Sequence, residues 1–170
     1  MSRIAVEHML ALVNESFESD VAHSLMASVR SVRPEDWDWL PPGGERTIRD
    51  VFEHAAIAKH LYAEHMFGAA KRSYEDVLGE SPLRARSDDT DALLAWAREA
   101  QTAFAAGVAA LDDAALDAPT RRHYGVLDTV QGSIGTVVRH DCFHAGEINH
   151  LRALRQGNDR WWQPPKPVAS

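Results

Sequence analysis

Four long stretches of the chain repeat apolar residues at steps of three and four, and this pattern constrains the fold more than any other feature. The stretch that begins near Asp88 carries the clearest stripe, made of Leu93, Trp96, Ala97, Ala100, Phe104, Val108 and Leu111. Such a period gathers the apolar side chains on one face of an α-helix. No strand pattern of comparable strength appears. The chain is therefore expected to be all-α.

The ends of the expected helices carry recognisable signals. We expect helices over residues 2–30, 48–67, about 88–111 and 129–155. Pro34 follows the first of them, Thr47 with Asp50 resembles an N-cap, and Asp128 with Gln131 can cap the last. Long linkers rich in Pro, Gly and Asp separate the four helices. This order predicts an up-down four-helix bundle with long inter-helix loops.

The size of the chain suits one domain. Its 170 residues are 45% hydrophobic, which is enough for a sizeable core. We expect a single domain over residues 1–160 and a loosely ordered, Pro-rich tail over residues 161–170. Tryptophans outside the helices are expected to cover the core or a dimer contact, and the alternative is that they line a substrate mouth. They are Trp37, Trp39, Trp161 and Trp162.

Charge and composition exclude several classes of protein. A formal net charge of −7 argues against generic nucleic-acid binding. No window approaches the roughly 18 uninterrupted apolar residues of a membrane span. The single cysteine, Cys142, rules out an internal disulfide framework and fits a reducing compartment. We therefore expect a cytoplasmic protein that binds neither nucleic acid nor membrane.

His140 and His144 lie one helical turn apart in the fourth expected helix. Residues four apart project from one face of a helix, about 6 Å apart along its axis, so two imidazoles in this arrangement can bind one divalent metal. Their stripe also carries Val137 and Leu151 and is otherwise largely apolar. Histidine pairs of this spacing are also common on solvated helix faces, so a third ligand from another helix is needed to favour metal binding.

His54 is the best candidate for that third ligand. In the second expected helix it shares a stripe with Val51 and Leu61, and so it faces the core. His60 lies on another side of the same helix. His65 shares the stripe but lies about 16 Å further along the axis, too far to join the same site. The histidines without a comparable spacing argument are His8, His23, His123 and His150.

Two segments of the chain resemble the DinB-like superfamily, also called DinB and YfiT, of metal-binding four-helix bundles. Residues 47–54 are similar to its second-helix histidine segment, and residues 140–148 to its fourth-helix pattern of His, three residues, His, one residue, Gly-Gln-Ile. The resemblance implies a three-histidine site formed by His54, His140 and His144, with water completing the coordination. It also implies a homodimer.

Three neighbours of the histidine pair need separate interpretations. Glu147 stands where the family usually has glutamine. We expect it either to hold a metal-binding residue in place, without binding the metal itself, or to act as a base. The catalytic residue is otherwise unknown. Asp141 lies about 100° around the helix from His140, which favours a surface or helix-pairing role. Cys142 lies about 200° from His140 and is expected to be a packed structural thiol.

The expected chemistry follows from the ligand type. Three neutral imidazoles leave a divalent metal its full positive charge, so the ion can acidify a bound thiol or water. The resemblance implies thiol transfer, in which a low-molecular-weight thiol of the bacillithiol or mycothiol type attacks a small-molecule electrophile. Our first hypothesis is therefore a metal-dependent thiol S-transferase. The alternatives are a non-catalytic, stress-associated dimer that binds metal or a small ligand, and a metal-assisted hydrolase with Glu147 as base.

The metal itself leaves little trace in the sequence. Zinc, nickel, iron and manganese all accept imidazole nitrogens. We expect zinc or nickel before iron or manganese.

Overall fold

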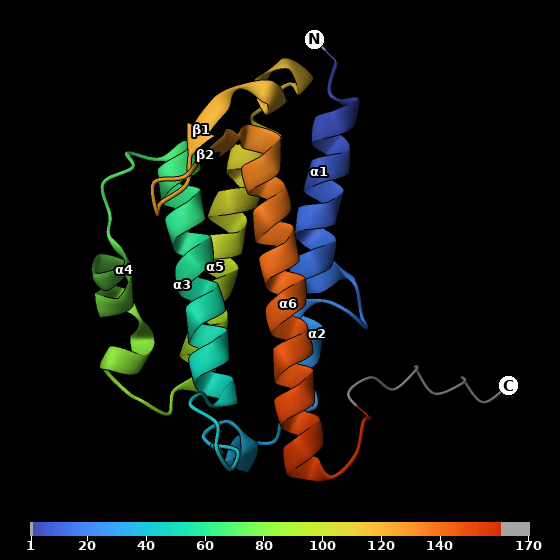
Figure 1. Ribbon diagram of the computed structural model, residues 1–170, viewed down its shortest axis with the longest axis vertical. Coiled ribbons are helices and arrows are strands. Elements are labelled where there is room, and N and C mark those ends of the chain that lie inside the picture. The colour runs from blue at the N-terminus through green and yellow to red at the C-terminus, as the bar shows by residue number, and fades with distance from the viewer. Residues whose placement is uncertain (1, 161–170) are drawn as a thin grey trace, which may run out of the picture.

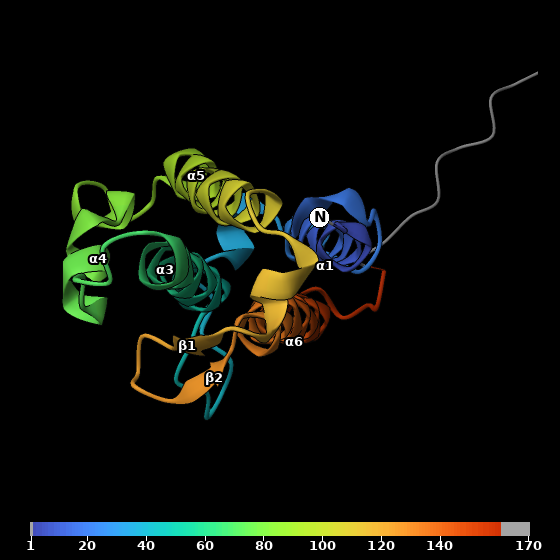
Figure 2. The ribbon, with the colours of Figure 1, turned by 90° about the horizontal axis from the view of Figure 1, so that it is seen from above.

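Four helical stretches run along the long axis of the computed structural model, which describes residues 2–160 (Figure 1). The three unbroken ones are α3 (Ile48–Phe67), α5 (Thr90–Ala109) and α6 (Val130–Gln156). The first stretch is built from two shorter helices, and the view from above shows all four around a common centre (Figure 2). The expected all-α bundle is confirmed.

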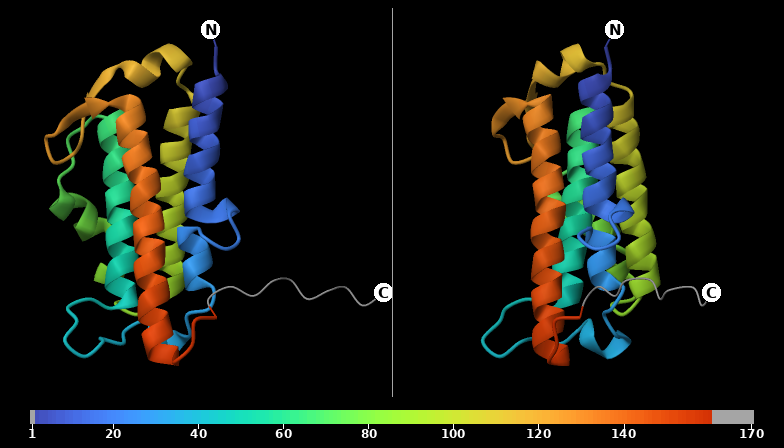
Figure 3. Two further views of the ribbon diagram at one scale, coloured as in Figure 1. Left: turned by 45° about the vertical axis from the view of Figure 1, so that its right-hand side comes forward. Right: turned by 90° about the vertical axis from the view of Figure 1, so that its right-hand side faces the viewer.

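The first stretch is broken, and the expectation of one helix over residues 2–30 is wrong. It consists of α1 (Ile4–Asn14), a π-helical segment (Glu15–Ser19) and α2 (Leu25–Val29), stacked end to end (Figure 3). Asp20 explains the break because its Oδ1 accepts the backbone N–H groups of Ala22 and His23, at 2.7 and 2.9 Å. Such local bonds compete with helical ones. Ser24 then caps α2.

The linker between α3 and α5 contains structure of its own. It forms α4 (Tyr74–Glu80) and a 3-10 turn (Pro82–Arg84), and it passes down the outside of α3 (Figure 1). This return brings the chain back to the end where α3 began. As a result α5 runs in the same direction as α3, which departs from a simple up-down order.

A short hairpin lies between α5 and α6. It pairs β1 (Pro119–Arg121) antiparallel with β2 (Leu127–Thr129), and a 3-10 segment (Asp113–Asp117) precedes it. The hairpin covers the outside of the bundle beside α3 and α6 (Figure 2). The sequence did not predict it because three residues are too few to reveal an alternating pattern.

The cap of α6 differs from the expected pair of Asp128 and Gln131, which is wrong. Thr129 is the N-cap, with its Oγ1 accepting the N–H of Gly132 at 3.1 Å. Asp128 binds the guanidinium of Arg122 in the hairpin instead, and Gln131 turns to the preceding 3-10 segment. The hairpin and the segment before it therefore draw the two side chains away from the helix end.

The loop before α3 folds onto the core as expected. Trp37 is buried, and its ring meets Phe52 edge-on at 6.0 Å between centroids. Trp39 is half-buried beneath the guanidinium of Arg155. The expectations for Trp161, Trp162 and the tail concern residues outside the described range. No helix within residues 2–160 has the length and apolarity to cross a membrane.

The core consists of two apolar clusters with polar side chains between them. The first cluster includes Phe17, Leu25, Phe52, Leu93, Ile148 and Leu151. The second includes Val6, Val13, Tyr62, Phe104, Ile134 and Val137. Each helical stretch contributes a buried polar residue near the boundary between the two clusters. These residues, here called the polar layer, are Ser16, Lys59, Gln101 and Asp141.

The polar layer connects the helical stretches to one another. Lys59 donates hydrogen bonds to Gln101 Oε1 at 2.8 Å and to Asp141 Oδ2 at 2.5 Å. Ser16 donates to the same oxygen of Asp141 at 3.1 Å, and Gln101 donates to the carbonyl of Val13 at 3.2 Å. Of the two roles expected for Asp141, the structure shows the pairing of helices, because the residue is 1% exposed.

Candidate metal centre

The structure brings together the three histidines selected from the sequence. His54 comes from α3, and His140 and His144 come from successive turns of α6. Each offers a ring nitrogen, and these nitrogens lie within 4.8 Å of one another. The ring centroid of His54 is 5.3 Å from that of His140 and 5.0 Å from that of His144. The three imidazoles therefore converge on one point.

Local structure explains why the two helices present these side chains. A capping box between Thr47 and Asp50 fixes the start of α3, which sets the direction of every later side chain in that helix. On α6 the spacing of four residues stacks His140 over His144, with ring centroids 4.3 Å apart. His144 is buried, while His54 and His140 are half-buried.

The distances between nitrogen atoms fit a divalent ion. The Nε2 atoms of His140 and His144 are 3.2 Å apart. Two nitrogens bound to one tetrahedral zinc at its usual bond length lie about 3.3 Å apart. His144 Nδ1 faces Glu147 Oε2 at 2.8 Å, and a proton on Nδ1 leaves Nε2 with a free lone pair. The donor set and the spacing of the His140–His144 pair therefore suit such an ion, and His54 offers a third nitrogen within 4.8 Å of both.

The surroundings keep the three imidazoles neutral. Burial, followed by the neighbouring His144 and His54, lowers the pKa of His140 to about 3. Burial, followed by His54 and Arg46, lowers the pKa of His144 to about 4. The pKa of His54 is lowered as well, mainly by burial. Neutral imidazole is the form that binds metal, so the site has its ligands ready near pH 7.

Glu147 lies beside the cluster and contacts one of its members. One carboxylate oxygen bonds to His144 Nδ1, and the other lies 3.7 Å from Arg46 Nη1. The carboxylate is thus placed behind His144, next to a cation from the loop that precedes α3.

A cavity of about 240 Å³ opens beside His54 and His140. Its other walls include Tyr62, Tyr74 and the hairpin residues His123 and Tyr124. Sequence reasoning did not identify these hairpin residues as part of a site. His123 has no spacing relationship to the other histidines, and only the hairpin brings it near them.

Apart from His123, the other histidines either have a hydrogen-bond partner or are exposed. His60 Nε2 lies 3.1 Å from the carbonyl of Trp96, and His65 Nε2 lies 2.8 Å from that of Arg72. Three further histidines are exposed, namely His8, His23 and His150.

Cys142 corrects one expectation. Its side chain is directed away from the cluster, as its place on the helix predicts, and it lines a small cavity with Ser16 and Val138. The cysteine is free and exposed, so the expectation of a packed thiol is wrong. The seam between α1 and α6 leaves this position at the surface.

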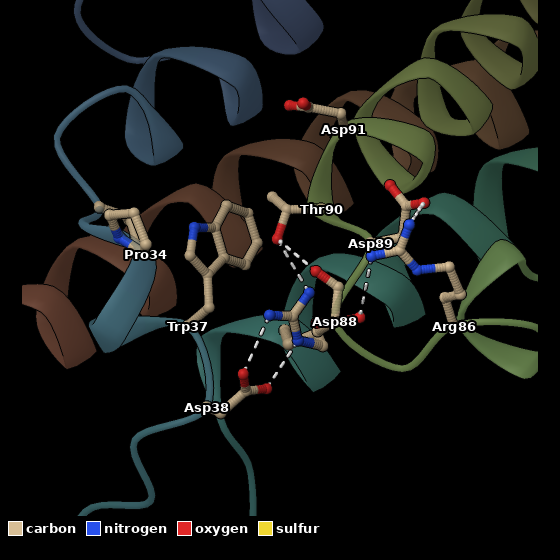
Figure 4. A pocket seen from close by; sticks show the side chains of 10 residues that line it. Pro34, Trp37, Asp38, Arg86, Asp88, Asp89, Thr90 and Asp91 are labelled. Atoms are coloured by element: carbon tan, nitrogen blue, oxygen red, sulfur yellow. Dashed lines mark hydrogen bonds and ion pairs between the residues drawn. The ribbon is translucent and has the colours of Figure 1, made fainter.

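A larger cavity of about 600 Å³ lies where α3 begins, and Arg49 of α3 forms part of its lining (Figure 4). Its lining holds two arginines and four aspartates, and both arginines contact aspartates of the lining. Arg49 donates two hydrogen bonds to Asp38, at 2.6 and 3.0 Å, and a third to Thr90. Arg86 lies 3.8 Å from Asp89. Both arginines are thus paired internally, and no histidine or cysteine among the described residues lines the cavity, so it gives no comparable indication of a metal ion.

The comparisons with known proteins agree with this arrangement. Residues 19–148 match the family model of the DinB superfamily, and this range contains all three converging histidines. No curated protein matches the chain.

Proposed function

Because the chain belongs to the DinB superfamily, we propose that His54, His140 and His144 bind one divalent metal ion. We further propose that the protein is a metal-dependent S-transferase that joins a low-molecular-weight thiol, of the bacillithiol or mycothiol type, to a small electrophile. The observation that carries the proposal is the convergence of three neutral imidazoles, from two helices, within 4.8 Å.

The charges around the cluster support this chemistry. A divalent ion bound by three neutral ligands would keep its full positive charge and would lower the pKa of a thiol beside it. Glu147 holds a proton on Nδ1 of His144, which directs the free lone pair of Nε2 into the cluster. The neighbouring cavity is large enough for a small electrophile.

The contacts of Glu147 agree with a supporting role for this carboxylate. One of its oxygens bonds to His144 Nδ1 at 2.8 Å, and the other lies 3.7 Å from Arg46 Nη1. Metal-assisted hydrolysis with Glu147 as the base is the further alternative to thiol transfer.

Several finer points belong to the same proposal. We expect zinc or nickel as the resident ion, with iron or manganese as alternatives. We also expect a homodimer in the cytoplasm. A non-catalytic, stress-associated metal or ligand-binding protein is the contrasting proposal, and it shares the metal site but predicts no turnover.

The first experiment measures metal content by elemental mass spectrometry. Wild-type protein is compared with His54→Ala, His144→Ala and a control, His150→Ala, which removes an exposed histidine from α6. We expect about one equivalent in the wild type and the control, and little in the two site variants. Equal metal content in all four proteins would contradict the site.

The second experiment addresses turnover. Metal-loaded protein is mixed with a panel of low-molecular-weight thiols and electrophiles, and loss of each electrophile is followed with and without thiol. Thiol-dependent loss that disappears in His144→Ala is the expected result. Metal binding without any such loss would leave the non-catalytic proposal as the better one.

A further inference from the structure

The cavity beside the histidines has an uncharged lining. Apolar Ala58 and Leu61 lie on one side, and rings of tyrosine and histidine lie around them. Among the described residues that form its walls, none has a carboxylate, an ammonium or a guanidinium group. A charged molecule that enters such a space loses water without gaining a partner from these walls. The lining therefore favours an uncharged occupant.

Size narrows the class of occupant further. The cavity volume is about 240 Å³, below the roughly 300 to 1,000 Å³ of sites for drug-sized ligands.

In the proposed function the thiolate would supply the negative charge that a bound cation attracts. The electrophile then needs no charge of its own.

Tyr124 lines the cavity and is 52% exposed, and its hydroxyl has two partners. Arg122 Nη1 donates to its hydroxyl oxygen at 2.7 Å, and the hydroxyl of Tyr62 donates to the same oxygen at 3.4 Å. Arg122 is itself held by Asp128. A tyrosine oxygen that accepts two hydrogen bonds still has its own hydrogen to donate.

The environment also strengthens that donor. Burial alone would raise the pKa of Tyr124, but the bonds from Tyr62 and Arg122 bring the pKa below its usual value. A more acidic hydroxyl donates a stronger hydrogen bond. Tyr62 shows the opposite change, because burial and its bond to Tyr124 raise its pKa.

From these contacts we infer that the cavity takes a small, uncharged carbonyl compound and that Tyr124 donates a hydrogen bond to its carbonyl oxygen. This inference rests on the proposed function in identifying that molecule as the electrophile. Tyr124 then selects for an acceptor oxygen, while the uncharged walls select against carboxylates and amines.

A conjugated carbonyl compound fits both requirements chemically. Sulfur of the thiol forms a bond to the β-carbon, and the electron pair of the carbon–carbon double bond moves toward the carbonyl oxygen. The Tyr124 hydrogen bond strengthens as that oxygen gains negative charge. The proton released by the thiol ends on the α-carbon, so the two reactants become one adduct and no group leaves.

The test measures binding and needs neither thiol nor turnover. Acetophenone, benzoate and ethylbenzene have similar size and one ring, but they differ in charge and in the presence of a carbonyl acceptor. Each is titrated into the full-length protein after metal has been removed with a chelator, so that no cation at the three histidines can attract benzoate, and affinity is measured by calorimetry. Shifts of the His54 and His140 ring signals in NMR spectra place the probe in the cavity.

We expect acetophenone to bind about three- to tenfold more tightly than ethylbenzene, as one hydrogen bond predicts, and benzoate to bind most weakly. Tyr124→Phe keeps the ring and should bring acetophenone down to the affinity of ethylbenzene. Arg122→Gln should weaken acetophenone binding in the same direction. Leu127→Ala, an exposed change in the same hairpin, is the matched control and should bind acetophenone as the wild type does.

Two results would overturn the inference. Acetophenone binding that is equal in Tyr124→Phe and wild type would show that the hydroxyl is not the donor. Tighter binding of benzoate than of acetophenone would show that the site prefers an anion. Because the assay contains no thiol, failure of thiol transfer in the turnover panel leaves these measurements unaffected, and the two failures can be told apart.

Discussion

Lys59 Nζ lies 2.5 Å from Asp141 Oδ2 at the centre of the bundle, and both side chains are almost completely buried. The two residues belong to the helices that supply the candidate ligands, and Asp141 directly follows His140 in the chain. Burial lowers the pKa of Lys59 and raises that of Asp141, while each partner opposes the shift of the other. The pair therefore ties α3 to α6 beside the three histidines.

Removing one partner of this pair should be costly. Lys59→Met leaves Asp141 buried beside Ser16 without its main partner, and we expect a loss of about 3–5 kcal/mol in the free energy of unfolding. Urea unfolding followed by circular dichroism measures it. The control is the double variant Lys59→Met with Asp141→Leu, which should recover most of the loss because no unpaired charge remains. A single variant within 1 kcal/mol of wild type would contradict the prediction.

Glu147 should contribute to metal affinity without being a ligand. In Glu147→Ala the proton on His144 Nδ1 loses its acceptor, and we expect metal affinity to fall about 10- to 100-fold. Glu147→Gln keeps an acceptor oxygen and should lose less. Competition with a chromogenic chelator measures the affinity. Glu99→Gln, at an exposed position of α5, controls for loss of a negative charge, and a fall as large in that variant would refute a specific role.

The stability of the metal-free protein should depend on pH. Folding lowers the pKa of His140 to about 3 and of His144 to about 4, from 6.5. Between these values the unfolded chain binds more protons than the native protein, so stability rises with pH in this range. We expect the free energy of unfolding to fall as the pH drops below about 6.5 and to keep falling toward about 3. Urea titrations at pH 7, 5.5 and 4.5 measure this.

The matched control for the pH series replaces both imidazoles. His140→Gln with His144→Gln removes the two titrating groups, so its free energy of unfolding should depend less steeply on pH over the same range. Identical slopes for this variant and the wild type would show that other groups cause the effect.

Two glycines should respond oppositely to the same substitution. A Cβ atom at Gly107 of α5 would lie 2.2 Å from Cδ2 of Phe67, whereas one at Gly146 of α6 would meet nothing within 4 Å. We expect Gly107→Ala to destabilise the protein by about 1–3 kcal/mol and Gly146→Ala to stabilise it by about 0.5–1 kcal/mol. Thermal unfolding of both variants checks this, and a stabilised Gly107→Ala would contradict the close helix approach.

The sequence predicted the cluster of three histidines because helical spacing pairs two of them, and the apolar stripe and the family resemblance select the third. His140 and His144 are one turn apart, and His54 lies on the apolar stripe of the helix that packs against them.

The break in the first helical stretch after Ser19 depends on one carboxylate, that of Asp20, which accepts backbone N–H groups. Periodicity does not report such bonds.

The parts that the sequence did not reveal depend on contacts between distant segments. Tyr124 reaches the cavity through strands of three residues each, which are too short to recognise. Asp141 is buried because Lys59 and Ser16 from two other helical stretches meet it. Its position on one helix leaves a surface role and a buried pair equally open.

The polar layer divides the core, and this division has a consequence for local unfolding. Each apolar cluster draws residues from all four helical stretches. We therefore expect each end of the bundle to open as a separate cooperative unit, with its own rate of amide hydrogen exchange. His54 lies among residues of the first cluster, and His140 follows residues of the second in α6. Ligation of both histidines would join the two ends, and slower exchange would then appear in both at once.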